Sequence, residues 1–174
     1  EVRKAVEKWW AEVQRRGEKV VLIEGVETGG YDSPGQAAGL VEAYPGAALP
    51  ALSKGISRAT ESWVRSELVR SAGELHGEAP VKLLLHELRT SPFPEARATA
   101  ATLLRNRGRA EAVPAMVAYW RSLRGNRKLD DAVIEFMTST DSPRTFRALA
   151  QGFRQWPVEV RLEIVEKVSE GRYR

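Results

Sequence analysis

The feature that most constrains the fold is an apolar pattern that recurs every 32 residues without a gap. In one track, the residues at i, i+3, i+4 and i+7 are mostly apolar, which is the spacing of one helix face. Its four copies begin at Leu49, Val81, Val113 and Thr145, and a second track in the same register begins at Val64. Two amphipathic helices per 32 residues, four times over, predict a stack of helix pairs.

The register also predicts which residues form the core. In the last unit the first-helix pattern fits better when it is moved by one residue, onto Phe146, Leu149 and Phe153. The second track ends on a stripe that includes Ile164 and Val165. The residues predicted to be mostly buried in one continuous core are Leu84, Leu85, Ala100, Ala101, Leu104, Val117, Val133 and Phe136.

Capping residues lie where the pattern needs helix ends. Ser33 and Ser142 each precede a proline, which predicts an N-cap serine with proline at the first helical position. Glycines fall between stripes, where a helix can end in a left-handed residue. These glycines are Gly77, Gly108 and Gly125.

The N-terminal part follows the pattern less clearly. Residues 2–16 form a predicted leading helix that carries Trp9 and Trp10, which point about 100° apart on a helix, so one of them is expected to be partly exposed. Residues 18–46 resemble a degraded pair with a turn at 28–32. No alternating strand pattern of useful length is present, and ten or eleven helices are expected in total.

These boundaries define one predicted solenoid domain over residues 1–174. Its parts are a leading helix at 1–17, a degraded repeat at 18–46 and repeats at 47–77, 78–109, 110–141 and 142–174. The chain begins Glu1-Val2 and shows no targeting signal, so we expect a piece of a longer, bacterial-type protein. Its compartment stays open between cytoplasmic and exported.

The second helices share a recognisable sequence motif. Three of them open with an apolar residue followed by arginine: Val64-Arg65, Ala96-Arg97 and Val160-Arg161. Together with Ala100, Ala101 and Leu104, this resembles the HEAT repeat, although Lys128-Leu129 departs from it in the third unit. The resemblance implies an all-α fold: a right-handed α–α superhelix of about five helix pairs plus a leading helix.

The HEAT resemblance implies little about function, because the family includes scaffolds, transport receptors, bilin-lyase-like proteins and a branch of DNA glycosylases. The arginines at 65, 97 and 161 lie beside the apolar stripe. Since a guanidinium suits planar, multi-donor contacts, we expect these three to brace neighbouring repeats by contacting carbonyls or carboxylates, with ligand binding as the alternative.

Signals for enzyme chemistry are few. The chain has no cysteine, so a thiol nucleophile, a disulfide and thiolate zinc ligands are excluded. His86-Glu87 does not continue into a zinc-binding HExxH motif, and His76 is expected at a helix end. No phosphate-cradling loop or nucleophile elbow occurs. We therefore predict no catalytic, metal-binding or cofactor-binding residues and no cofactor.

The predicted solvent face of the second helices, which the HEAT resemblance implies is the concave face, is acidic. Of its twenty positions nine are acidic and two are basic, a net charge of −7, and its rows include Ser66, Leu162 and Ile134. Such a face favours a basic or polar segment of a protein partner over nucleic acid. The residues predicted to bind this partner are Trp63, Glu67, Asp131, Glu163 and Glu166.

Two basic turns provide the alternative. Residues 97–128 hold eight basic residues and one acidic residue, although the whole chain is only +4. These turns favour an anionic surface such as nucleic acid. Their candidate residues are Arg105, Arg107, Arg109, Arg121, Arg124, Arg127 and Lys128. The leading hypothesis is a non-enzymatic protein-interaction scaffold; a nucleic-acid binder ranks second and a HEAT-like DNA glycosylase or lyase relative third.

Overall fold

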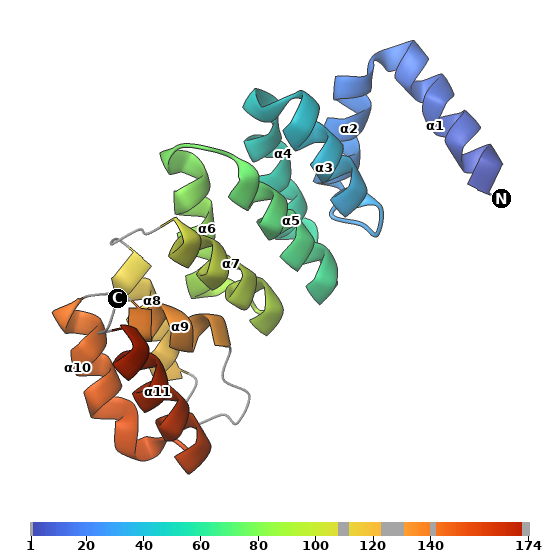
Figure 1. The fold of residues 1–174 in the computed structure, drawn as a ribbon. Helices are drawn as coiled ribbons and strands as arrows, with labels where there is room; N and C mark the ends of the chain where they lie inside the picture. The colour runs from blue at the N-terminus through green and yellow to red at the C-terminus, as the bar shows by residue number, and fades with distance from the viewer. Residues whose placement is uncertain (1, 108–111, 123–130, 140–141, 172–174) are drawn as a thin grey trace. The chain divides into compact units, whose positions relative to one another are not determined.

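Eleven α-helices follow one another along the part of the chain described by the computed structural model, which covers residues 2–107, 112–122, 131–139 and 142–171 (Figure 1). None of these residues belongs to a strand. The helices are α1 (Val2–Arg16), α2 (Glu18–Glu27), α3 (Ser33–Ala43), α4 (Pro45–Arg58), α5 (Ser62–Glu74), α6 (Glu78–Thr90), α7 (Pro94–Asn106), α8 (Val113–Ser122), α9 (Asp131–Ser139), α10 (Pro143–Gly152) and α11 (Val158–Gly171). The chain forms two compact units, Glu1–Leu83 and Leu84–Arg174.

The first unit stacks two helix pairs. Helix α2 packs on α4 and α3 packs on α5, while α1 contacts α2. Each helix contributes an apolar stripe, and a single pair could not cover its own stripe. The buried residues of this core include Leu22, Val26, Leu40, Leu52, Ile56, Val64, Leu68 and Val69. The weak pattern at 18–46 therefore does encode a helix pair.

Two glycines let α2 and α4 approach closely. Gly29, in the turn after α2, has φ of 64° and lies against the Gly55 carbonyl of α4. A Cβ atom at Gly55 would in turn lie 2.3 Å from the Val26 carbonyl oxygen. A side chain at either position would separate the backbones of the two helices, which explains the choice of glycine.

The second unit repeats the same stacking. Helices α7, α9 and α11 pack in a row, and α8 packs on α10. Trp120 of α8 and Trp156, just before α11, are both buried with ring centroids 4.6 Å apart. Within this unit, α9 therefore packs on α7, and α10 and α11 pack on α8 and α9, which is how helical repeats build a continuous core.

Most of the predicted core is confirmed. Leu84, Ala100, Ala101, Leu104, Val117 and Phe136 are buried. Leu85 is only half-buried, and the side chain of Val133 lies outside the described residues. Burial at these positions, spread over α6, α7, α8 and α9, confirms the 32-residue register.

The one-residue shift predicted for the last unit is wrong. Thr145, Ala148 and Leu149 are buried, as the unshifted register requires, whereas Phe146 is 57% exposed. Val165, assigned to the core stripe of the last helix, is 54% exposed. The physical reason is that α10 and α11 each carry two adjacent apolar stripes, and the helices before them in the unit cover only one.

The caps are partly as predicted. Ser142 caps α10, because its hydroxyl oxygen accepts a hydrogen bond from the Arg144 amide. Ser33 does not cap α3: it is the first helical residue, it is buried, and its hydroxyl donates to the Gly25 carbonyl at 2.8 Å. Gly77 has φ of 101° between α5 and α6, as expected. Gly108 and Gly125 lie outside the described residues.

Candidate interaction surfaces

Trp63 and Glu67 are one turn apart on α5, so they share a face. Trp63 is 42% exposed, and its ring meets the exposed Tyr31 edge-on with centroids 4.8 Å apart. The Glu67 carboxylate accepts two hydrogen bonds from Arg70 Nε, each 3.2 Å long. This surface therefore offers an aromatic pair beside a carboxylate that is partly neutralised by its own helix.

Glu163 and Glu166 lie on α11. Glu163 is half-buried and lies 3.9 Å from Lys167 Nζ, and Glu166 is exposed. Asp131 begins α9, but its side chain lies outside the described residues. Of the five predicted partner-binding residues, the structure thus places Trp63 with Glu67 in the first unit, and Glu163 with Glu166 in the second.

Two positions assigned to the solvent face are buried. Ile134 of α9 is 1% exposed, because α9 packs against α7, α8, α10 and α11 and so buries a wider face than its neighbours. Ser66 is also buried, since it lies about 60° round α5 from the core residue Val69. The solvent face of the second helices is therefore narrower than predicted.

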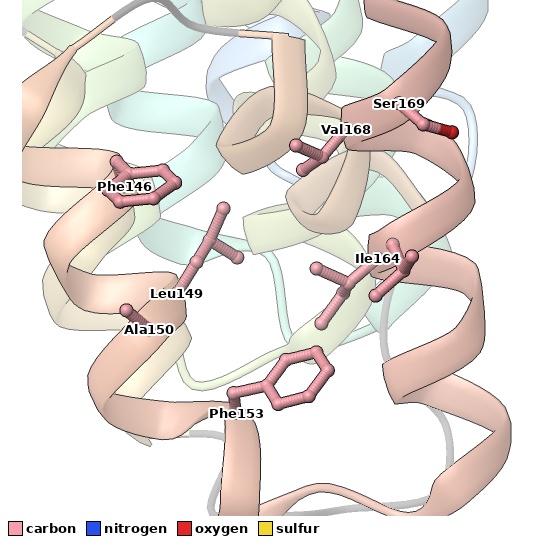
Figure 2. Close-up of a pocket in the computed structure, with 8 residues that line it drawn as sticks. Phe146, Leu149, Ala150, Phe153, Ile164, Val168 and Ser169 are labelled. Atoms are coloured by element: carbon pink, nitrogen blue, oxygen red, sulfur yellow. The ribbon is translucent and has the colours of Figure 1, made fainter.

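An apolar groove of about 800 Å³ runs between α10 and α11. Figure 2 shows its two walls, with Leu149 and Phe153 on one side and Ile164 and Val168 on the other. Its lining residues are Phe146, Leu149, Ala150, Phe153, Ile164, Val165, Val168 and Ser169. The two residues that the predicted core pattern misplaced, Phe146 and Val165, both belong to this groove.

The groove contains little polar chemistry. Ser169 is its one polar lining residue, and its hydroxyl donates to the Glu166 carbonyl at 2.7 Å, so it is engaged by its own helix. A small-molecule site usually combines an apolar pocket with several convergent polar groups. This groove instead suits an apolar side of another helix. The groove was not predicted from the sequence. The sequence did contain a sign of it, because either Thr145 or Phe146 could lie on the buried face of α10, which indicates two adjacent apolar stripes.

The basic turns are engaged within the second unit. Arg105 of α7 pairs with Glu135 of α9 and donates to Asn106. Arg121 donates to the Gln151 side chain of α10 at 3.3 Å. Arg107 is half-buried. The remaining candidates, Arg109, Arg124, Arg127 and Lys128, lie outside the described residues.

One of the three second-helix arginines clearly braces its neighbours. Arg97 Nε donates to the Ser91 carbonyl at 2.5 Å, and its guanidinium carbon lies 5.9 Å from the centre of the Tyr119 ring on α8. This confirms the structural role predicted for Arg97. Arg161 differs, because its Nε is buried without a hydrogen-bond partner among the described residues.

Both histidines are exposed: His76 lies between α5 and α6, and His86 lies on α6. Within the described ranges, no group of three or more His, Asp or Glu side chains is close enough to hold a metal ion. Across the same residues, we find no helix with the length and apolarity needed to cross a membrane.

The matched family agrees with this architecture. A family model described as HEAT repeats matches residues 81–168, just over half of the chain, from α6 to α11. No curated protein and no solved structure matches the chain. HEAT repeats generally serve as protein-interaction scaffolds. With its gapless 32-residue repeat, its stacked helix pairs and this match, the chain belongs to the HEAT-repeat family.

Proposed function

We propose that the chain is a non-enzymatic interaction module that binds a lysine- and arginine-rich segment of a protein partner on the acidic face of its second helices. The partner-binding residues would be Trp63, Glu67, Asp131, Glu163 and Glu166. The family supports the general role, and the arrangement of α11 supports the chemistry of the partner.

The surface of α11 carries the proposal. Leu162 is 64% exposed, and Glu159 and Glu166 lie three residues before it and four after it, so both border it on the helix. Carboxylates gathered on one face attract cations and speed their encounter. The exposed leucine gives the aliphatic stem of a bound lysine or arginine an apolar surface to cover.

Trp63 gives the first unit a second contact of the same kind. Its ring is exposed and packs edge-on against the ring of Tyr31. A lysine or arginine over an indole ring gains about 0.5–1 kcal/mol at an exposed site. Glu67, one turn along α5, would pair with a second cation next to the one that lies over Trp63.

The nucleic-acid alternative has weaker support. Arg105, with a side chain only 24% exposed, already pairs with Glu135, and Arg121 already donates to Gln151. An arginine must give up such contacts before it can neutralise a phosphate. The described part of the basic turns therefore favours a role in packing α7 on α9 and α8 on α10.

The proposal is tested by titrating the chain with a fluorescent peptide that contains only lysine, arginine, glycine and serine. We expect binding that weakens as salt rises, because exposed charges are screened. The combined variant Glu67→Gln, Glu163→Gln and Glu166→Gln should bind roughly tenfold more weakly, since each exposed ion pair contributes up to about 0.5 kcal/mol.

A matched control neutralises three exposed carboxylates that do not lie on the second helices or their caps: Glu7→Gln, Glu42→Gln and Glu78→Gln. Because its net charge equals that of the first variant, it separates a local face from overall charge. Equal binding by the two variants would contradict the acidic face. Tight binding of a single-stranded oligonucleotide, lost on Arg105→Gln with Arg121→Gln, would instead support the anionic ligand.

A further inference from the structure

Tyr31 and Trp63 form an exposed aromatic pair that brings together two parts of the first unit. Tyr31 lies in the turn between α2 and α3, and Trp63 lies in the first turn of α5. The two residues are 77% and 42% exposed, their ring centroids are 4.8 Å apart, and the ring planes meet at 71°. An edge-to-face pair of this kind leaves an open angle between a face of one ring and a face of the other.

This open angle can hold one cation against both rings. The face of an aromatic ring is its negative side, so it attracts a cation that lies within about 6 Å of the ring centroid. Because the two centroids are only 4.8 Å apart, a cation in the angle can be within that reach of both. The pair therefore attracts a cation more strongly than a single exposed ring does.

Two carboxylates lie beside the pair in the chain. Asp32 follows Tyr31 directly, and Glu61 comes two residues before Trp63. Both carboxylates are exposed, and although they occupy the N-cap positions of α3 and α5, neither side chain accepts a capping hydrogen bond. Since a helix N-terminus carries about half a positive charge, two carboxylates at two such ends leave a net charge of roughly −1, which favours a cation.

Three basic residues of α4 and α5 are directed elsewhere. Lys54 Nζ pairs with the Glu27 carboxylate at 2.9 Å, and Arg58 Nη1 donates to the Glu27 carbonyl oxygen at 2.9 Å. Arg65 is two residues after Trp63, so helix geometry turns it about 160° away from that ring. The angle is therefore open to a cation that a partner supplies.

The chemistry of the angle fits a methylated ammonium better than a bare one. The ammonium of an unmodified lysine is strongly hydrated and has three hydrogen-bond donors, whose water partners the ring faces cannot fully replace. Methylation keeps the positive charge. In trimethyllysine, the methyl groups replace all three donors and bury apolar surface on the rings.

We propose that the angle between Tyr31 and Trp63 binds a methylated lysine of the basic segment. The methyl groups pack on the two ring faces, and the positive charge is attracted by those faces and by the carboxylates of Asp32 and Glu61. This inference rests on the proposed function for the basic segment itself, and it adds a modification that the segment carries at one lysine.

The test compares labelled peptides of one sequence, built from lysine, arginine, glycine and serine, by fluorescence anisotropy with the whole chain. One lysine is either unmodified or trimethylated, and the trimethylated peptide should bind about fivefold more tightly. A third peptide replaces the trimethylammonium by an uncharged tert-butyl group of the same shape. It should lose the gain, because attraction to a ring face requires the charge.

Two variants each remove one ring from the pair. Tyr31→Leu and Trp63→Leu keep an apolar side chain at an exposed position, and each should abolish most of the preference for the trimethylated peptide. Trp10→Leu is the matched control, because it changes an exposed tryptophan of α1 outside the pair. It should keep the preference of the unaltered chain.

The carboxylates are tested by a variant of matched charge. Asp32→Asn combined with Glu61→Gln should weaken binding of the trimethylated peptide about threefold. Glu42→Gln combined with Glu78→Gln changes the net charge equally at exposed positions away from the pair, and it should bind as the unaltered chain does. Equal weakening by both double variants would contradict the role of Asp32 and Glu61.

Titration with tetramethylammonium separates this inference from the proposed acidic face, because it requires no peptide. The Trp63 indole N–H signal, assigned by its loss in Trp63→Leu, should move in the NMR spectrum of the unaltered chain and stay in place in Tyr31→Leu. A shifted signal would support the site even if the Glu67, Glu163 and Glu166 variant shows that the acidic face is wrong.

Three results would overturn the inference. The first is a Trp63 signal that tetramethylammonium leaves unmoved, even if the basic peptide binds to the acidic face. The second is equal affinity for the trimethylated peptide and either of its two analogues, because the angle would then not recognise a methylated cation. The third is tetramethylammonium binding as tight as that of the trimethylated peptide, which would assign the angle to a free ammonium ligand instead of a lysine.

Discussion

A Cβ atom on Gly55 would lie 2.3 Å from the carbonyl oxygen of Val26. Real Cβ atoms do not approach a backbone oxygen so closely, so the backbones of α4 and α2 touch at a point where a side chain cannot fit. The nearest side chain, Leu68 of α5, would also be contacted at 3.3 Å. Three helices of the first unit thus depend on the missing side chain at one position.

Gly55→Ala should therefore destabilise the first unit by about 1–3 kcal/mol, the usual cost of forcing extra atoms into a packed core. The loss should exceed the gain of about 0.5–1 kcal/mol that alanine normally gives over glycine within a helix. The free energy of unfolding is measured by urea titration, followed by circular dichroism.

Gly46→Ala is the matched control, because Gly46 lies in the same helix and a Cβ there would meet nothing within 4 Å. We expect it to be neutral or slightly stabilising. If the two alanine variants unfold at the same urea concentration, the close approach of α4 to α2 is not what selects glycine at position 55.

Phe136 and Phe146 test the register in the second unit. Phe136 is 2% exposed on α9, so Phe136→Ala should cost about 3–5 kcal/mol. Phe146 is half exposed beside the groove, and Phe146→Ala should cost less than about 1 kcal/mol. Urea unfolding compares the two. A larger loss at Phe146 would restore the shifted register that the structure rejects.

The fold was largely predictable because burial of a helical stripe depends on local spacing. Leu104 and Phe136 were placed in the core from the 32-residue register alone, and both are buried. The orientation of α10 was not predictable in the same way. It has apolar residues on two adjacent stripes, and its neighbours decide whether Thr145 or Phe146 turns inward.

Local hydrogen bonding caused a second kind of error. Ser33 before proline has the sequence of an N-cap, but its hydroxyl reaches back to the Gly25 carbonyl and lies 3.0 Å from the Thr28 hydroxyl oxygen. The tight turn after α2 brings these groups together. The sequence pattern of an N-cap does not show that a competing acceptor, the Gly25 carbonyl, lies within reach of Ser33, because only the folded turn brings the two groups together.

The candidate surfaces were less predictable than the fold, because the sequence shows which residues are charged but not which of them form ion pairs with one another. Glu67 is counted as one negative charge of the predicted face, but its carboxylate accepts hydrogen bonds of 3.2 Å from Arg70 Nε. Arg105 is counted as one positive charge of the basic turns, but its guanidinium pairs with Glu135, which is 30 residues away in the sequence. The contact between α7 and α9 creates that pair, so local sequence gives no sign of it.

Glu12 provides a test by pH. The hydrogen bond from Arg15 is the largest influence on its carboxyl and, with the charges of Arg15, Arg16 and Lys8, holds the pKa of Glu12 below its ordinary value despite some desolvation. A folded-state pKa below the unfolded value means that the ionised carboxylate stabilises α1. That contribution is present above the unfolded pKa and is lost as pH falls through the folded one.

Arg15→Gln should raise the Glu12 pKa towards its ordinary value, as measured by NMR titration of the side-chain carboxyl. It should also reduce the extra fraying of α1 that acid causes in the unaltered chain. Arg3→Gln is the control, because Arg3 pairs with Glu7 and should leave the Glu12 titration in place. An unchanged Glu12 pKa in Arg15→Gln would show that the i,i+3 pair does not persist in solution.

Arg97 distinguishes a brace from a ligand-binding residue. Its Nε donates to the carbonyl of the buried Ser91, and its guanidinium lies near the ring of Tyr119 on the next repeat. Arg97→Met removes both contacts and leaves a buried carbonyl without its donor, which should cost about 1.5–3 kcal/mol. Arg97→Lys keeps the charge but lacks Nε, so it should recover only part of this loss.

Arg89→Met, at an exposed position of α6, should change stability by less than about 0.5 kcal/mol. Urea unfolding of the three variants gives the order. If Arg97→Met were as stable as Arg89→Met, the arginine would not be a brace, and the ligand-binding role would become the better explanation of its place beside the apolar stripe.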